Sequence, residues 1–248
     1  MKICIINLSG NVGKTTIAVH LLGAFNPAAK IISVESFNAT AANDVKSLDV
    51  DELAASRFKE IYREIMLNDD VVVDVGVSNV GAFMTEVARF KSSIGEFDLV
   101  LVPTVPADKQ QKDTNATINW LNANGITGNK IRVIFNQYDT NKLEPIEQTY
   151  AQVIGYLLTD GQGKAVYEPY ATIAQNEIYE MVKTTGKTIK ELASDTTDWK
   201  ALRNEAKAAK DLEKLDMAMD GQMAHDLALS AQTNLAEVHA LLFSKGKK

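Results

Sequence analysis

Five short apolar runs lie in the first 140 residues, and each adjoins a segment with helical periodicity. The runs occupy residues 3–7, 30–34, 71–75, 99–102 and 131–135. Apolar runs of this length are typical of strands buried on both faces, and their alternation with helices is typical of parallel sheets. The pattern therefore predicts an α/β fold, with a mostly parallel β-sheet and helices on both of its faces.

Three stripes of apolar side chains at helical spacing lie between these runs. They comprise Leu53, Phe58, Ile61, Ile65 and Met66; Phe83, Val87, Phe90 and Ile94; and Ile118, Trp120 and Leu121. Because apolar stripes of this width face a core in globular proteins, we interpret them as sheet-packing faces rather than binding surfaces.

The composition changes in the last fifth of the chain. Residues 197–243 are rich in Ala, Leu, Lys, Glu and Met, and they include no proline and a single glycine, Gly221. This composition favours helices, whereas glycine favours a break, so we predict two helices that separate near Asp220 and Gly221. Residues 1–195 are expected to form one domain. Residues 196–248 are expected to form a helical extension packed on that domain or on a partner.

The bulk composition limits the class of protein. The chain has 248 residues, a formal net charge of −6 and a pI of about 5.2, which argue against a protein that coats nucleic acid. Its single cysteine, Cys4, lies in an apolar run and is interpreted as a buried strand thiol. One cysteine excludes an internal disulfide, so a reducing, cytoplasmic setting is expected. No apolar run approaches the ~20 residues of a membrane-spanning helix, and the N-terminus does not resemble a signal peptide.

A loop rich in small residues follows the first predicted strand and precedes a helix. Its members are Ser9, Gly10, Asn11, Val12, Gly13, Lys14, Thr15 and Thr16. Glycines let backbone N–H groups turn towards phosphate oxygens, and a helix N-terminus adds further donors and a positive dipole end. Lys14 can place its charge between the β- and γ-phosphates, and Thr15 can offer its hydroxyl to Mg²⁺. The loop therefore predicts a site for a nucleoside triphosphate and magnesium.

Two neighbouring positions bear on this interpretation. Leu8 stands where the general phosphate-loop pattern has its first glycine, so only the core Gly-x-x-Gly-Lys-Thr-Thr is kept. Asp74 follows three valines in a predicted strand, where a carboxylate can hold magnesium through a water molecule. Asp74 and Thr15 are therefore the predicted metal-binding residues.

These residues resemble the ParA/MinD-type ATPases, whose deviant Walker A loop reads Lys-Gly-Gly-x-Gly-Lys-Thr-Thr. Asp74 matches the Walker B acid of that family, residues 97–103 resemble its strand ending in proline, and Asn136 matches the asparagine that commonly reads adenine. The resemblance covers roughly residues 1–195 and implies ATP and Mg²⁺ as ligands. No Asn/Thr-Lys-x-Asp guanine-reading motif follows the fifth predicted strand, which also favours ATP.

The string at residues 7–16 looks most like the StbB plasmid-stability branch of this family. That likeness implies a role in plasmid stability, partition or conjugation, together with a small DNA-binding adaptor protein from the same operon. The family resemblance also implies a nucleotide-dependent homodimer.

Two positions depart from the family pattern. Ser9 replaces the signature lysine, which in the family reaches the partner's nucleotide across a dimer, and a hydroxyl cannot supply that charge. After the second predicted strand the family has Asp-x-Asp, whereas this chain has Glu35 at the first acid and Phe37 at the second. Because Phe37 cannot orient an attacking water, we expect hydrolysis to be slow, dependent on a partner, or assisted by Glu35 or Asp44.

Lys14, Glu35 and Asp74 are therefore the candidate catalytic residues of an ATP-driven switch. Two other functions stay open: a module that binds nucleotide without hydrolysing it, and a metabolic enzyme on the same scaffold. The enzyme would need a second substrate pocket with clustered acids or bases, whereas the histidines are scattered along helical patterns. These are His20, His225 and His239.

Direct contacts with DNA or with a membrane surface are less favoured than solvated or docked helices. The basic residues of the helical segments alternate with acids, which is typical of a solvated face. They are Arg57, Lys59, Arg63, Arg89, Lys91, Lys200, Arg203, Lys207 and Lys210. The apolar positions near the C-terminus can form a membrane-surface helix, but docking on the body or on a dimer mate is the favoured interpretation. These positions are Leu235, Val238, Leu241, Leu242 and Phe243.

Overall fold

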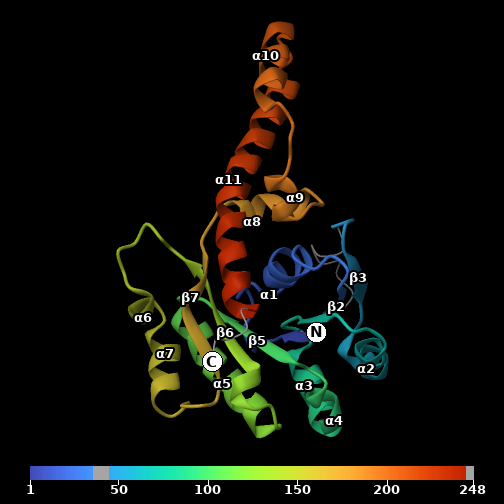
Figure 1. Ribbon diagram of the computed structural model, residues 1–248, viewed down its shortest axis with the longest axis vertical. Coiled ribbons are helices and arrows are strands. Elements are labelled where there is room, and N and C mark those ends of the chain that lie inside the picture. Colours follow the sequence, from blue (N-terminus) through green and yellow to red (C-terminus); the bar gives the residue numbers. More distant parts are fainter. Residues whose placement is uncertain (36–44, 244–248) are drawn as a thin grey trace.

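The computed structural model of the chain describes residues 1–35 and 45–243, apart from the side chains of residues 169 and 170 (Figure 1). Within these ranges, seven strands form one parallel sheet in the order β3-β2-β4-β1-β5-β6-β7. The strands are β1 (Lys2–Ile5), β2 (Lys30–Val34), β3 (Asp49–Glu52), β4 (Val71–Val75), β5 (Leu99–Thr104), β6 (Ile131–Tyr138) and β7 (Val166–Ala174). The predicted α/β fold with a parallel sheet is confirmed.

The five strands predicted from apolar runs form the middle of the sheet, and two further strands form its edges. Cys4 is buried in the central strand β1, as predicted. β3 reads Asp-Val-Asp-Glu and has no apolar run. Its aspartates instead form ion pairs with Lys30 of the neighbouring strand β2. The Lys30 Nζ atom lies 2.7 Å from Asp49 and 3.0 Å from Asp51. β7 includes the proline at position 169, which an edge strand tolerates.

Helices cover both faces of the sheet (Figure 1). One face carries η2 (Ala55–Arg57), α2 (Phe58–Leu67), α3 (Val80–Arg89), α4 (Lys91–Gly95), α5 (Asp108–Ala123), α6 (Ile146–Thr149) and α7 (Ala151–Leu158), with η3 (Gly128–Lys130) leading into β6. The other face carries α1 (Lys14–Thr16) with its π-helical continuation η1 (Ile17–Gly23), α8 (Ile178–Met181), η4 (Val182–Thr184), α9 (Ile189–Ala193) and α11 (Leu212–Phe243). α10 (Trp199–Ala209) packs on α11. Each face thus has its own apolar cluster.

The stripe predicted for the first helix is only partly buried. Phe58, Ile61 and Ile65 of α2 face the core, but Met66 is 54% exposed because it lies one position off the buried side. Phe90 of the next stripe is 45% exposed, since it lies where α3 ends and α4 begins. Its ring stacks on Phe58 near the surface, with 6.0 Å between the ring centroids.

The C-terminal helices differ from the prediction. α10 ends at Ala209, and the next residue, Lys210, has a left-handed backbone with φ of 54°. α11 then runs without interruption. The predicted break near Asp220 and Gly221 is therefore wrong. Gly221 lies inside α11 because the two helices approach closely: a Cβ at this position would stand 2.4 Å from the ring of Trp199. The glycine permits helix packing rather than ending a helix.

α11 connects the body of the molecule to a projecting hairpin. Its second half packs on the sheet, where Leu235 and Val238 are fully buried and the rings of Phe25 and His239 stack 4.5 Å apart. Its first half pairs with α10, and the two helices project away from the sheet (Figure 1). Among the described residues, no helix combines the length and the apolar character that crossing a membrane requires.

Candidate functional site

The candidate site lies at the carboxyl edge of the sheet, around the end of β1. This strand pairs with β4 on one side and with β5 on the other, so the connections diverge at this point. Parallel α/β sheets bind ligands at such a switch point. The loop at residues 9–16 follows β1, and Asp74, Glu35 and Asn136 come from β4, the end of β2 and β6.

Most of the predicted site residues line a single cavity of 370 Å³. Its lining comprises residues 10–16 of the loop, Glu35, Gly76, Val77, Asn136, Gln137, Tyr179, Glu180 and Lys183. Ser9 and Asp74 lie behind this lining, and each is only 2% exposed. The volume is within the range of pockets that hold small-molecule ligands.

The loop backbone adopts conformations that glycine and asparagine favour. Gly13 has φ of 87° and Asn11 has φ of 57°, both in the left-handed region. Asn136 lies directly against the loop: its Nδ2 atom donates to the Val12 carbonyl at 2.9 Å, and a Cβ on Gly13 would stand 2.0 Å from that nitrogen. The glycine is therefore required both by its backbone angle and by the asparagine beside it.

The Lys14 side chain reaches back across the loop. Its Nζ atom donates to the carbonyl of Ser9 at 2.8 Å and to that of Asn7 at 3.4 Å. Burial lowers the pKa of this ammonium, while the charges of Asp74 and Glu35 oppose the shift. The result is a cation at the floor of the cavity, held by carbonyl groups that an anion can replace.

Thr15 and Asp74 form the contact that joins the loop to β4. The Thr15 hydroxyl donates to Asp74 Oδ2 at 2.7 Å. The other oxygen, Oδ1, is buried and has no hydrogen-bond partner among the described residues. Burial raises the pKa of the Asp74 carboxyl to about 6, against the opposing effects of the Thr15 hydrogen bond and the Lys14 charge. The donor set of hydroxyl and carboxylate oxygens suits a hard divalent cation such as Mg²⁺.

Ser9 faces the protein interior. Its hydroxyl donates to Asp113 Oδ2 on α5, and the same oxygen lies 3.1 Å from Lys109 Nζ. These two partners hold the pKa of Asp113 below its usual range. The position that carries the signature lysine in the resembling family is therefore occupied by a buried hydroxyl that braces the loop against α5.

Glu35 extends from the end of β2 over the backbone of Gly76. A Cβ at Gly76 would stand 1.7 Å from Glu35 Oε1, and Glu35 Oε2 accepts a hydrogen bond from Ser78 at 3.0 Å. This carboxylate lines the same cavity as Lys14 and Thr15. Phe37 and Asp44, which enter the expectation of slow hydrolysis, lie outside the described residues.

Asn136 makes contacts with both ends of its amide. Nδ2 donates to Val12, and Oδ1 accepts from the backbone N–H of Gln137 at 2.9 Å. Gln137 has φ of 60°, and its own amide reaches the Asn11 carbonyl at 3.4 Å. Asn136 thus braces the phosphate loop.

One wall of the cavity, formed by α8 and η4, is not predicted by the sequence. Tyr179 contributes a buried hydroxyl that has no hydrogen-bond partner among the described residues. Lys183 Nζ lies 2.6 Å from Glu180 at the cavity rim. Nothing in the local sequence marks these residues, because the fold alone brings them to the loop some 160 positions earlier in the chain.

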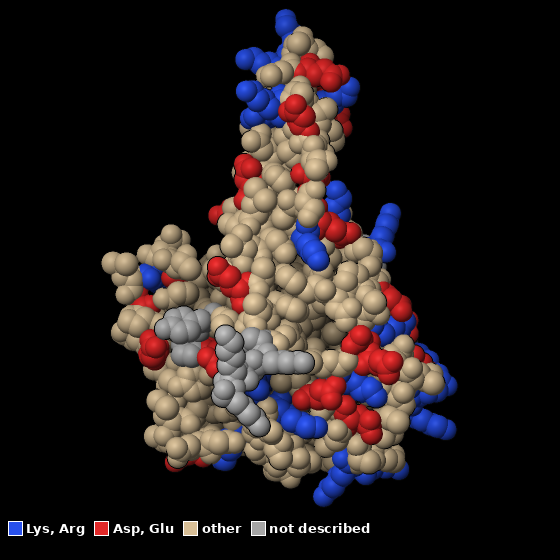
Figure 2. Space-filling view, in the orientation of Figure 1, with Lys and Arg blue, Asp and Glu red and all other residues tan. Residues whose placement is uncertain are grey.

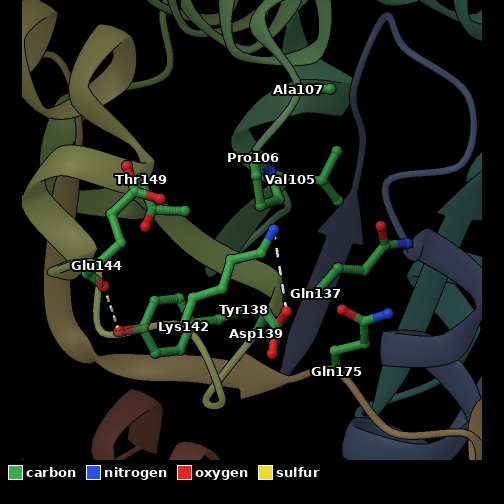
Figure 3. Close-up of a pocket in the computed structure, with 10 residues that line it drawn as sticks. All are labelled: Val105, Pro106, Ala107, Gln137, Tyr138, Asp139, Lys142, Glu144, Thr149 and Gln175. Carbon is green, nitrogen blue, oxygen red and sulfur yellow. Dashed lines mark hydrogen bonds and ion pairs between the residues drawn. The ribbon is translucent and has the colours of Figure 1, made fainter.

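A second cavity of 290 Å³ adjoins the first at Gln137 (Figure 3). It lies at the ends of β5 and β6, where Lys142 Nζ is 3.9 Å from Asp139 and the Tyr138 hydroxyl donates to the Glu144 carbonyl at 2.7 Å. Gln175 enters from the end of β7. The cavity holds one ion pair and two amide side chains.

The histidines lie away from the phosphate loop cavity. His20 is buried in η1, where its Nδ1 atom accepts a hydrogen bond from the Ile189 N–H at 3.3 Å, and burial lowers its pKa to about 4. His225 Nδ1 lies 2.9 Å from the Leu192 carbonyl. His20 thus connects η1 to α9, and His225 connects α11 to α9.

No protein-family model matches the chain, and no curated protein matches its sequence. Several solved structures do match. The MinD cell division protein of Aquifex aeolicus aligns with a TM-score of 0.57 and 13% identity, over 100% of this chain and 98% of that one. The septum site-determining protein MinD of Pyrococcus horikoshii, complexed with Mg-ADP, aligns with a TM-score of 0.52 and 16% identity, over 100% and 99%.

A third match is a protein assigned to plasmid partition, from Borrelia burgdorferi and bound to AMPPNP. It aligns with a TM-score of 0.52 and 12% identity, over 98% of each chain. At these identities the likeness establishes the fold. The chain therefore has the parallel α/β fold of P-loop nucleoside triphosphatases that MinD and the partition protein share.

Proposed function

We propose that the chain is an ATP-binding molecular switch of the ParA/MinD type, with Mg²⁺ as its metal. The shared fold supports this proposal, as does the loop built around Gly13 and Lys14. The Pyrococcus horikoshii MinD structure, with the same fold, contains Mg-ADP.

One observation carries the proposal. Asp74 presents a buried carboxylate oxygen with no hydrogen-bond partner among the described residues, next to the hydroxyl of Thr15. Leaving such a group unsatisfied is costly, so a further ligand is expected. Thr15 and Asp74 would hold Mg²⁺, directly or through water. When bound, the metal supplies positive charge that neutralises the phosphates.

The remaining groups have distinct tasks in binding the nucleotide. Backbone N–H groups of residues 10–16 would bind phosphate oxygens, and Lys14 would exchange its carbonyl partners for phosphate. Asn136 and Gln137 line the same cavity as the loop, and we assign adenine recognition to Asn136.

Hydrolysis depends on how well water is positioned. Two described carboxylates line the cavity: Glu180 pairs with Lys183, whereas Glu35 accepts a hydrogen bond from Ser78 and carries no ion pair among the described residues. One such acid supports slow turnover that a partner accelerates by completing the site. Lys14, Glu35 and Asp74 are the residues to which we assign the chemistry.

The finer role that we propose is in plasmid stability, partition or conjugation in the cytoplasm, with a small DNA-binding adaptor protein as partner. The resemblance at residues 7–16 to StbB proteins and the likeness to a partition protein support it. A nucleotide-dependent homodimer is part of the proposal. Direct DNA contact is its weakest element, and DNA affinity that does not fall with salt would remove it.

Calorimetric titration tests the nucleotide site. We expect Mg-ATP to bind more tightly than Mg-GTP, and EDTA to weaken the binding. Lys14→Ala should abolish it, and Asp74→Asn should weaken the Mg²⁺-dependent part by ~10-fold or more. Equal affinity of wild type and Lys14→Ala would contradict the proposal. Steady-state ATPase with and without the adaptor then separates a switch, which is stimulated, from a module that only binds nucleotide.

The cavity beside Gln137 supports a second candidate function, a nucleotide-dependent ligase or synthetase. Asp139 and Lys142 could orient a small polar substrate next to the nucleotide. This function predicts ATP consumption in the presence of a small-molecule acceptor. It also predicts that Asp139→Asn removes this activity while ATP binding persists.

A further inference from the structure

Two lysines and two glutamates are the charged residues in the described lining of the phosphate loop cavity. Lys14 comes from the loop and Glu35 from the end of β2, whereas Glu180 and Lys183 come from the wall formed by α8 and η4. Asp74 lies behind the lining and adds its negative charge to those of the glutamates. The cations of the cavity are therefore already balanced by carboxylates, although a phosphate chain is itself an anion. Tight binding of such a chain requires that this balance changes.

Lys183 is a cation whose partner is easily exchanged. Its Nζ atom donates to Glu180 Oε1 at 2.7 Å and to Glu180 Oε2 at 2.6 Å. The two side chains are 52% and 79% exposed. Exposed ion pairs contribute little to stability, because water solvates the separated charges well. Separating this pair therefore costs little free energy, and it leaves the Glu180 carboxylate in solvent.

The other charged groups of the lining are held more firmly. Lys14 is only 7% exposed and is held by backbone carbonyl groups at the floor of the cavity. Glu35 accepts a hydrogen bond from Ser78. Lys183, in contrast, carries its charge on a flexible four-carbon stem at the cavity rim. It is therefore the second cation of the described lining that a phosphate chain can recruit.

We propose that Lys183 binds the phosphate chain of the nucleotide, and that Glu180 holds this lysine at the rim of the cavity until the nucleotide arrives. This inference rests on the proposed ATP site. On binding, Lys183 exchanges the Glu180 carboxylate for a phosphate oxygen, so one charge-assisted hydrogen bond replaces another. Glu180 turns to solvent, and the rim gains a positive charge that faces the ligand. The nucleotide then connects η4 to the phosphate loop.

Calorimetric titration with Mg-ATP tests this exchange, because the two partners should have opposite effects. Lys183→Gln should weaken Mg-ATP binding by ~10-fold or more, since it removes a charged hydrogen-bond donor. Glu180→Gln should tighten binding by ~3-fold or more, because it frees Lys183 and removes a negative charge from the rim. In the double variant most of this gain should disappear, because Glu180 acts through Lys183. Both side chains are exposed, so these variants are expected to fold normally.

Lys187→Gln is the matched control. Lys187 is 51% exposed, pairs with Asp195 at 3.6 Å and lines a different cavity, at the base of the hairpin. Its substitution removes the same charge four positions along the chain, and the affinity for Mg-ATP should stay within ~2-fold of wild type because salt screens exposed charges.

Acetylation of lysine amines gives a second readout, which needs no variant. Lys183 and Lys187 have nearly equal exposure, so both should react in the ligand-free protein. Saturating Mg-ATP should suppress the acetylation of Lys183 and leave that of Lys187 unchanged, as measured by mass spectrometry of the digested protein.

Three results would overturn the role of Lys183. They are equal affinity of wild type and Lys183→Gln for Mg-ATP, weaker binding by Glu180→Gln, and acetylation of Lys183 that Mg-ATP does not suppress. In each case wild type still binds Mg-ATP, so the proposed ATP site stands. If wild type does not bind Mg-ATP, the proposed function fails and the role of Lys183 fails with it.

Discussion

Asn136 lies against Gly13, with its amide nitrogen 2.0 Å from where a Cβ on the glycine would stand. That nitrogen donates to the Val12 carbonyl, so β6 holds the phosphate loop in its left-handed turn. The loop's shape therefore depends on a residue more than 120 positions away in the sequence.

Gly13→Ala should destabilise the protein and abolish ATP binding. An alanine would strain the backbone at φ of 87° and collide with Asn136, so we expect a loss of at least about 2 kcal/mol in the free energy of unfolding. Gly81→Ala is the matched control, because Gly81 lies in α3 with nothing within 4 Å of an added Cβ. Urea denaturation and calorimetry measure both effects. A stable Gly13→Ala variant with normal ATP binding would contradict the prediction.

The stability of the ligand-free protein should depend on pH through two opposing groups. Burial raises the pKa of Asp74 from 3.8 to about 6, so the native state binds the extra proton and Asp74 makes stability fall as pH rises from 4 to 6. Burial lowers the pKa of His20 from 6.5 to about 4, so His20 makes stability rise over nearly the same range. Each effect is about 3 kcal/mol, and they nearly cancel in the wild type.

Single variants should separate these two contributions. In urea denaturation without Mg²⁺, Asp74→Asn should leave a free energy of unfolding that rises from pH 4 to 6.5. In His20→Gln, the free energy of unfolding should fall between pH 4 and 6. Parallel pH profiles for the wild type and both variants would show that neither group titrates as its burial requires.

Gly221→Ala should loosen the hairpin although alanine is the better helix former. The added methyl group would collide with the Trp199 ring. The cost of this overlap should exceed the ~1 kcal/mol by which alanine stabilises a helix relative to glycine. Gly155→Ala in α7 has open space and should instead stabilise the protein. Hydrogen exchange of α10 measures the first effect and thermal unfolding the second. The double variant with Trp199→Leu should recover protection, and failure to do so would place the strain elsewhere.

Ser9→Lys should not by itself change the oligomeric state of the protein with ATP. Ser9 is 2% exposed and its hydroxyl faces Asp113, so a lysine there is expected to pair with that carboxylate inside its own chain. Light scattering with Mg-ATP should give the same mass for Ser9→Lys and for wild type. A larger mass only in the variant would mean that the side chain turns outward.

The parts predicted from sequence were those encoded by local patterns. The central strands follow from valine and isoleucine runs, and the loop at Lys14 and Thr15 follows from its spacing. β3 was missed because its Asp-Val-Asp-Glu sequence depends on Lys30 of the neighbouring strand. The role of Gly221 was mistaken because the helix-breaking tendency of glycine is local, whereas the ring of Trp199 that requires it comes from another helix.

In the candidate site, too, some features follow from local sequence and others only from tertiary contacts. Asp74 was found from its place after three valines, but nothing local revealed that one of its oxygens has no partner among the described residues. Tyr179 of α8 and Lys183 of η4 reach the cavity because α8 packs against α11. That packing is a property of the tertiary fold and is not encoded in the local sequence.

The unbroken length of α11 has a mechanical consequence. Its 32 residues extend roughly 48 Å. Its N-terminal part stands clear of the sheet (Figure 1). A rigid rod anchored at Leu235 and Val238 works as a lever. Leu212, at the hairpin tip, lies roughly 35 Å from Leu235 along the helix, so a tilt of about 10° at the anchor would carry the tip through roughly 6 Å. A glycine break at residue 221 would have absorbed that tilt. Without one, small displacements beside the sheet are amplified at the far end of the molecule.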